Sequence, residues 1–123
     1  MDTALPGGKD NVLLEKSFVF GVRMFKLGRY LQGEQREYVL SKQIVRSGTS
    51  IGANAEEAVD AISKADFSAK ISVAYKEARE TSYWLRLLHA AECLPVPLFD
   101  SLEADCQELC RILFSILRTS GRA

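Results

Sequence analysis

Apolar side chains recur every three or four residues along most of this chain, which is the spacing of one face of an α-helix. Four segments show this period, at residues 11–32, 36–62, 64–92 and 97–119, and none shows the strict alternation of a half-buried strand. The connections between them are short, so consecutive helices are expected to be antiparallel neighbours. The pattern predicts an all-α, antiparallel up-down-up-down four-helix bundle.

The ends of the chain lack this period. Pro6, Gly7 and Gly8 are poor helix residues with little to bury, so residues 1–10 are predicted to form a flexible N-terminal arm. The bundle itself is expected over residues 11–119, followed by a C-terminal tail at 120–123. Ser63 and Asp66 resemble a capping box that begins the third helix.

The first helix carries two adjoining apolar stripes where the surface of a monomer needs only one. One stripe is Leu13, Phe20, Met24, Leu27 and Leu31, with Ser17 in the gap. The other is Leu14, Phe18, Val22 and Phe25. Tyr83 and Trp84, which are adjacent in the third helix, point about 100° apart, so only one can face the core fully. Both features predict an oligomer in which sister copies cover the second apolar surface.

The second helix contains the sequence RSGTSIGANAEEA at residues 46–58, which is rich in small side chains. Glycine inside a helix costs about 1 kcal/mol relative to alanine. Gly48 and Gly52 are therefore expected to allow a close approach of a neighbouring backbone. The apolar stripe of this helix is Leu40, Ile44, Gly48, Ile51, Ala55, Ala58 and Ile62.

A polar stripe runs beside the apolar one on the second helix. Two interpretations remain open: a binding surface or subunit contact, and hydrogen bonding within the bundle. We expect Arg46 to bridge to Glu77 or Glu80 of the third helix. The candidate packing or interface residues are Arg46, Ser47, Gly48, Ser50, Gly52, Asn54, Glu57, Glu77, Glu80 and Trp84.

The whole chain has 123 residues, which fits one domain, and a formal net charge of zero from 16 basic and 16 acidic residues. A neutral chain has no global basic field to recruit nucleic acid. No signal peptide or membrane-length apolar run is visible, so we expect a cytoplasmic protein with no membrane contact. The three cysteines are then expected to be reduced, mostly buried thiols.

No group of residues indicates catalysis. A di-iron centre in a helical bundle needs Glu-x-x-His motifs, whereas Arg86 stands three positions before His89, the one histidine. A nucleophile elbow and a phosphate-binding glycine loop are also absent. We therefore expect no enzymatic activity, no catalytic residues, no metal, no cofactor and no small-molecule substrate.

Basic residues recur on the first helix. Lys9, Lys16 and Arg23 are seven residues apart and share one side of it, with Lys26 and Arg29 rotating away. In a monomer this is an ordinary solvated surface. In a cyclic oligomer it repeats around an axis and becomes multivalent, so these five residues are the candidate contacts to RNA or DNA.

Two sequence blocks resemble one bacterial family. Residues 38–58 (YVLSKQIVRSGTSIGANAEEA) resemble its second helix, and residues 63–67 (SKADF), 76–81 (KEARET) and 83–88 (YWLRLL) resemble its third. This is the four-helix-bundle or 23S rRNA intervening-sequence protein family, and the resemblance extends over about residues 11–119.

The resemblance implies a non-enzymatic four-helix bundle that assembles into a ring-like homopentamer. A related group, the accessory proteins of diversity-generating retroelements, shares the pentameric barrel and binds nucleic acid through a strongly basic surface. The expected function is thus a self-associating scaffold that contacts RNA or DNA. The alternative is a protein–protein adaptor with no nucleic-acid role, which the neutral net charge favours.

Overall fold

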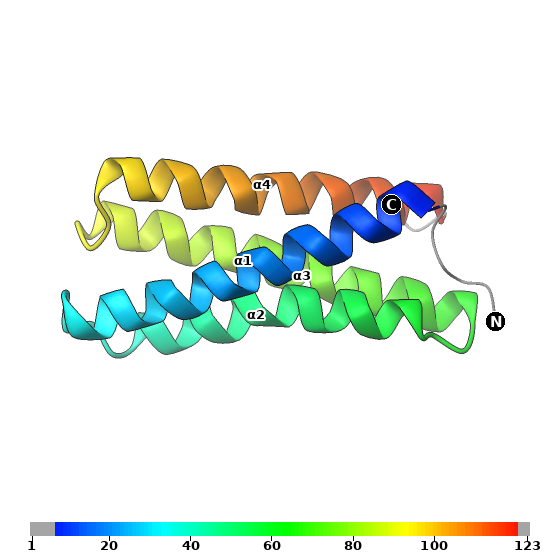
Figure 1. The fold of residues 1–123 in the computed structure, drawn as a ribbon, viewed down its shortest axis with the longest axis horizontal. Coiled ribbons are helices and arrows are strands. Elements are labelled where there is room, and N and C mark those ends of the chain that lie inside the picture. Colours follow the sequence, from blue (N-terminus) through cyan, green and yellow to red (C-terminus); the bar gives the residue numbers. More distant parts are fainter. Residues whose placement is uncertain (1–6, 121–123) are drawn as a thin grey trace.

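Four long helices make up the part of the chain that the structure describes (Figure 1). It is a computed structural model that describes the backbone of residues 7–120 and the side chains of residues 12–120. The helices are α1 (Gly7–Gly33), α2 (Leu40–Val59), α3 (Lys64–Ala90) and α4 (Val96–Thr119). No strand occurs between residues 7 and 120, so the prediction of an all-α fold with four helices is confirmed.

Each helix packs against two others. α1 contacts α2 and α4, and α3 also contacts α2 and α4, so the four helices form a closed ring of neighbours. The chain runs back and forth along the long axis, and α1 begins at the end of the bundle where α4 ends (Figure 1). As a consequence, the seam between α1 and α2 lies on the opposite side of the bundle from the seam between α3 and α4.

Several helix boundaries differ from the predicted ones. α1 begins at Gly7, so residues 7–10 of the predicted arm are helical. The cost of glycine applies to a helix interior, and Gly7 and Gly8 lie in the first turn. Arg36 has a φ of 52° and Glu92 a φ of 65°, both in the left-handed region. Arg36 lies before the start of α2 and Glu92 lies after the end of α3, although both had been predicted to be helical.

Side chains cap the starts of α2 and α3. The Glu37 carboxylate accepts hydrogen bonds from the backbone N–H groups of Val39 (3.1 Å) and Ser41 (2.8 Å) at the start of α2. At α3 the Ser63 hydroxyl accepts from the Asp66 N–H at 3.0 Å, as the capping box predicts. The Asp66 carboxylate accepts from the N–H of Ile62, one residue before the expected partner.

The core follows the predicted stripes with one correction. All members of the first α1 stripe are buried, including Ser17. Ile62, which was assigned to the α2 stripe, is 81% exposed because α2 ends at Val59. The three cysteines are free thiols, of which Cys106 and Cys110 are buried.

Candidate functional site

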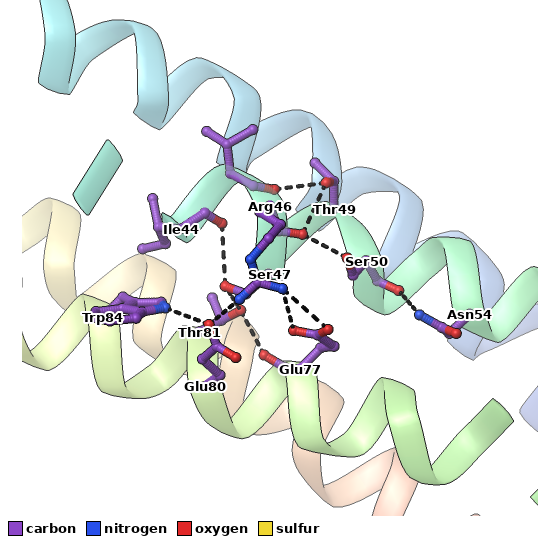
Figure 2. A network of polar contacts seen from close by, with 11 residues as sticks. Ile44, Arg46, Ser47, Thr49, Ser50, Asn54, Glu77, Glu80, Thr81 and Trp84 are labelled. Atoms are coloured by element: carbon purple, nitrogen blue, oxygen red, sulfur yellow. Dashed lines mark hydrogen bonds and ion pairs between the residues drawn. The ribbon is translucent and has the colours of Figure 1, made fainter. Parts of the chain in front are cut away.

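The seam between α2 and α3 holds a polar network centred on Arg46 (Figure 2). Its guanidinium donates to Glu77 at 3.2 Å and also pairs with Glu80, so the expected ion pair is present with both carboxylates. Trp84 donates its indole N–H to Glu80 at 2.9 Å. The hydrogen bond with Glu80 raises the pKa of Arg46, although burial opposes the shift. This arginine stays charged and joins two helices, which is a structural role rather than acid–base chemistry.

A second, buried contact lies one residue further along α2. The hydroxyls of Ser47 and Thr81 are 2.8 Å apart, and both residues are fully buried. Ser50 and Asn54 donate to carbonyl groups of their own helix, at 2.7 and 2.9 Å. These members of the polar stripe therefore form hydrogen bonds within the bundle.

Glu57, the last member of the polar stripe, lies near the far end of α2. Its carboxylate accepts a hydrogen bond from the ammonium of Lys70 on α3 at 2.7 Å. This hydrogen bond raises the pKa of Lys70. Sequence reasoning assigned no partner to Glu57, and the structure supplies one from the helix next to it.

The two glycines of α2 lie against α1. A Cβ at Gly52 would be 3.3 Å from the backbone carbonyl oxygen of Ser17, so the predicted close approach of a backbone is found there. At Gly48 the neighbour is a side chain: an added Cβ would overlap Met24, lying 2.8 Å from its sulfur and 2.9 Å from its Cβ.

A third close-packing glycine, on α1 itself, was missed at the sequence level. A Cβ at Gly28 would overlap the side chain of Val45. The signal was available, because Gly21 and Gly28 are seven residues apart and share one side of α1. The Cβ of a residue at Gly21 would have the backbone of Thr49 at 4.0 Å, an ordinary contact distance.

Three members of the predicted second stripe of α1 are exposed in the single chain, whereas the fourth, Leu14, packs against the core. Val19, which was not assigned to that stripe, is exposed beside them. Phe18 is 64% exposed, Val19 53%, Val22 42% and Phe25 55%, and we call these four residues the α1 apolar face. Beside it, a groove of about 410 Å³ follows the seam between α1 and α2. Its floor is lined by small residues, among them Gly21 and Gly52.

The predicted basic row is partly neutralised by α4. Lys16 pairs with Glu108 at 3.3 Å, and Arg23 pairs with Asp105 at 2.6 Å. Arg23 also donates to the Ser101 hydroxyl at 3.0 Å.

The other members of the basic row keep their charge available or cannot be placed. Arg29 lies over the ring of Phe25, 5.9 Å from its centroid, and Lys26 is exposed. The side chain of Lys9 lies outside the described residues. The row therefore presents less free positive charge than the sequence suggests.

Neither a metal site nor a membrane segment is found within the part of the chain that the structure describes. No group of three or more His, Cys, Asp or Glu residues is arranged there to hold a metal ion. His89 stacks on Phe99 with ring centroids 4.2 Å apart. No helix among these residues is both long and apolar enough to cross a membrane.

Comparison with known proteins points to one family. The model of a family described as 23S rRNA-intervening sequence protein matches residues 9–115. A crystal structure of a protein of unknown function from the S23 ribosomal protein family of Bacteroides thetaiotaomicron VPI-5482 is 49% identical to this chain, with a TM-score of 0.88. The match covers 89% of this chain and 98% of that one. No curated protein matches the chain. Since the family model spans most of its length, this chain belongs to the 23S rRNA-intervening sequence protein family.

Proposed function

We propose that this chain is the subunit of a non-enzymatic, cytoplasmic homo-oligomeric scaffold, built from antiparallel up-down-up-down bundles that meet through the α1 apolar face. The observation that carries the proposal is the exposure of Phe18, Val19, Val22 and Phe25 on one helix. A contiguous apolar patch on a small protein is typical of an interaction site. Two of the four are aromatic residues, which are enriched in the cores of interfaces.

A second copy of the chain is the occupant that we favour. The groove beside the face is lined by small residues, among them Gly21 and Gly52, so aromatic side chains of a sister copy can pack into it. Oligomers of one chain are the commonest assemblies of soluble proteins, and most have closed symmetry. The family resemblance favours a ring of five.

The mass of the native particle tests this proposal. We expect a mass several times that of the 13.7 kDa subunit by light scattering at micromolar concentration, and five times that mass for a pentamer. Phe25→Ser and Phe18→Ser should lower the mass because each removes an exposed aromatic anchor.

The matched control is Ile62→Ser, which also removes an exposed apolar side chain but lies outside the α1 apolar face. This variant should keep the native mass. A native protein that scatters as a monomer, or an Ile62→Ser variant that dissociates as readily as the Phe25→Ser variant, would refute the proposal.

In this scaffold, the free cations of α1 would contact RNA or DNA. Repetition of Lys26 and Arg29 around a ring would give a multivalent basic surface from a neutral chain. The adaptor without a nucleic-acid role is the second candidate, and the pairing of Lys16 with Glu108 and of Arg23 with Asp105 favours it. Phosphate contacts weaken steeply with salt. Binding to ribosomal RNA that falls between 50 and about 200 mM salt would support the first candidate, and no binding at low salt would support the second.

A further inference from the structure

A second groove, of about 590 Å³, lies between α3 and α4, on the side of the bundle opposite the α1–α2 seam. Its volume is within the range of small-molecule sites, roughly 300–1,000 Å³. Three arginines line it, Arg79 and Arg86 from α3 and Arg111 from α4, together with one carboxylate, Glu103. The lining is therefore positive, although the chain as a whole is neutral.

The three arginines keep most of their hydrogen-bond donors free. None of them forms an ion pair with a described carboxylate, in contrast to Arg23 and Arg46. Arg79 donates one N–H to the Tyr75 hydroxyl at 3.0 Å, and this bond raises its pKa. Since a guanidinium has five N–H donors, the groove can still offer several to an anion.

The carboxylate of Glu103 has one oxygen satisfied and one not. Its Oε2 accepts hydrogen bonds from the Ser82 hydroxyl at 2.8 Å and from the Gln107 amide at 3.1 Å. Its Oε1 is buried and makes no hydrogen bond to any described group. A buried acceptor without a donor is unfavourable and rare in native proteins. The site thus calls for a donor at Oε1 as well as an anion at the arginines.

Two further features of the lining bear on the ligand, and the first, an aromatic pair, suits a flat ring. Tyr75 and Phe114 form an aromatic pair with ring centroids 5.9 Å apart, and Phe114 is 42% exposed. The thiol of Cys110 also borders the groove. Hydrogen bonding with Cys106 lowers the pKa of Cys110, and the charges of Arg79 and Arg111 act in the same direction. Burial and the charge of Glu103 oppose this shift, so the case for an anion site rests on the three arginines.

We propose that the α3–α4 groove binds a nucleoside monophosphate. The phosphate would be held by Arg79, Arg86 and Arg111, and the base would lie against the exposed Phe114 ring. The Glu103 carboxylate would turn into the groove, so that its Oε1 accepts a hydrogen bond from an N–H of the base. Guanine suits this acceptor best, because its N1–H and N2–H groups present adjacent donors. The inference does not depend on self-association through α1.

Titration calorimetry of the native protein with GMP, guanosine and inorganic phosphate tests the site. GMP should bind more tightly than either fragment, and its affinity should fall with rising salt. Arg79→Gln and Arg111→Gln should each weaken GMP about tenfold or more. The matched control is Arg118→Gln, which removes an exposed arginine of α4 outside the groove and should leave the affinity unchanged. Glu103→Gln removes the one carboxylate of the lining, so it should weaken GMP relative to inorganic phosphate.

Three outcomes would overturn the proposal. They are no binding of GMP at millimolar concentration, equal binding by the native and arginine variants, and a change in native mass in the arginine variants, which would make the groove a subunit contact. A further titration uses a short RNA that ends in a guanosine with a 5′-phosphate. Binding of the RNA with no binding of GMP would also contradict a mononucleotide site. The mass test of the α1 apolar face is separate, so failure here leaves the scaffold proposal standing.

Discussion

Helix α2 meets its two neighbours in different ways. Towards α1 it presents Gly48 and Gly52, and the contact is one of shape, with Met24 and the Ser17 backbone filling the space that a Cβ would take. Towards α3 it presents Ser47 and Arg46, and the contact is made by hydrogen bonds and ion pairs. Ser47 and Gly48 are adjacent in sequence, so one step of about 100° around the helix separates the two kinds of packing.

This difference bears on which side of α2 lies next to exposed apolar surface. Gly48 and Gly52 allow α1 to pack closely against α2. Phe18, Val22 and Phe25 are exposed and line the groove beside this contact. The polar side ties α3 to α2 through groups with directional requirements, which specify one register. The polar contact thus fixes the register of α3 against α2, whereas the glycine contact leaves the α1 apolar face exposed, as the proposed association requires.

The largest expected effect is at the glycine contact. Gly48→Leu should lower the free energy of unfolding by roughly 1–3 kcal/mol, at the upper end of that range, because the new side chain meets buried Met24. Rotation of the Met24 side chain cannot relieve the 2.9 Å contact with its Cβ. Urea unfolding followed by circular dichroism, at one fixed protein concentration, measures the change.

Gly33→Leu is the matched control, since nothing lies within 4 Å of the Cβ of a residue at that position. It should stay within about 0.5 kcal/mol of the native protein. Equal losses in the two variants would mean that glycine at position 48 is not there for close packing.

A smaller effect is expected at the buried hydroxyl pair on the other side of α2. Thr81→Val keeps the side-chain shape but leaves the Ser47 hydroxyl with one distant partner, the Ile44 carbonyl at 3.5 Å. The loss should be about 1 kcal/mol, the low end of the range for a buried group without a partner. The same urea measurement applies.

The double variant Ser47→Ala/Thr81→Val is the informative comparison. It removes both hydroxyls, so it should be less destabilised than the sum of the two single variants. Strict additivity would show that the two hydroxyls do not act as a pair.

Much of this architecture could be predicted from the sequence. The period of apolar residues located all four helices, because a core-facing stripe must repeat with the turn of the helix. Helix ends were less predictable: Arg36 and Glu92 leave the helical region through left-handed backbone, which no apolar pattern reveals. Ile62 was misassigned to the core for the same reason, since it continues the spacing of α2 beyond the end of that helix.

The candidate sites were predicted unevenly. The link from Arg46 to Glu77 and Glu80 followed from charge and from the expected adjacency of the two helices. The neutralisation of Lys16 and Arg23 did not, because it depends on how α1 is rotated against α4. The α3–α4 groove was also missed, since its arginines and Glu103 come from two helices whose relative register the sequence leaves open.

The smallest expected effect concerns the exposed part of the polar side of α2. The Arg46 side chain is 48% exposed and that of Glu80 35%, so water and salt screen their attraction. A double-mutant cycle with Arg46→Ala and Glu80→Ala should give a coupling energy of about 0.5–1 kcal/mol that shrinks in 1 M NaCl. No coupling at low salt would show that Arg46 does not link α2 to α3. A coupling that persists in 1 M NaCl would instead show that the pair is shielded from solvent, as it would be if a neighbouring subunit covered it.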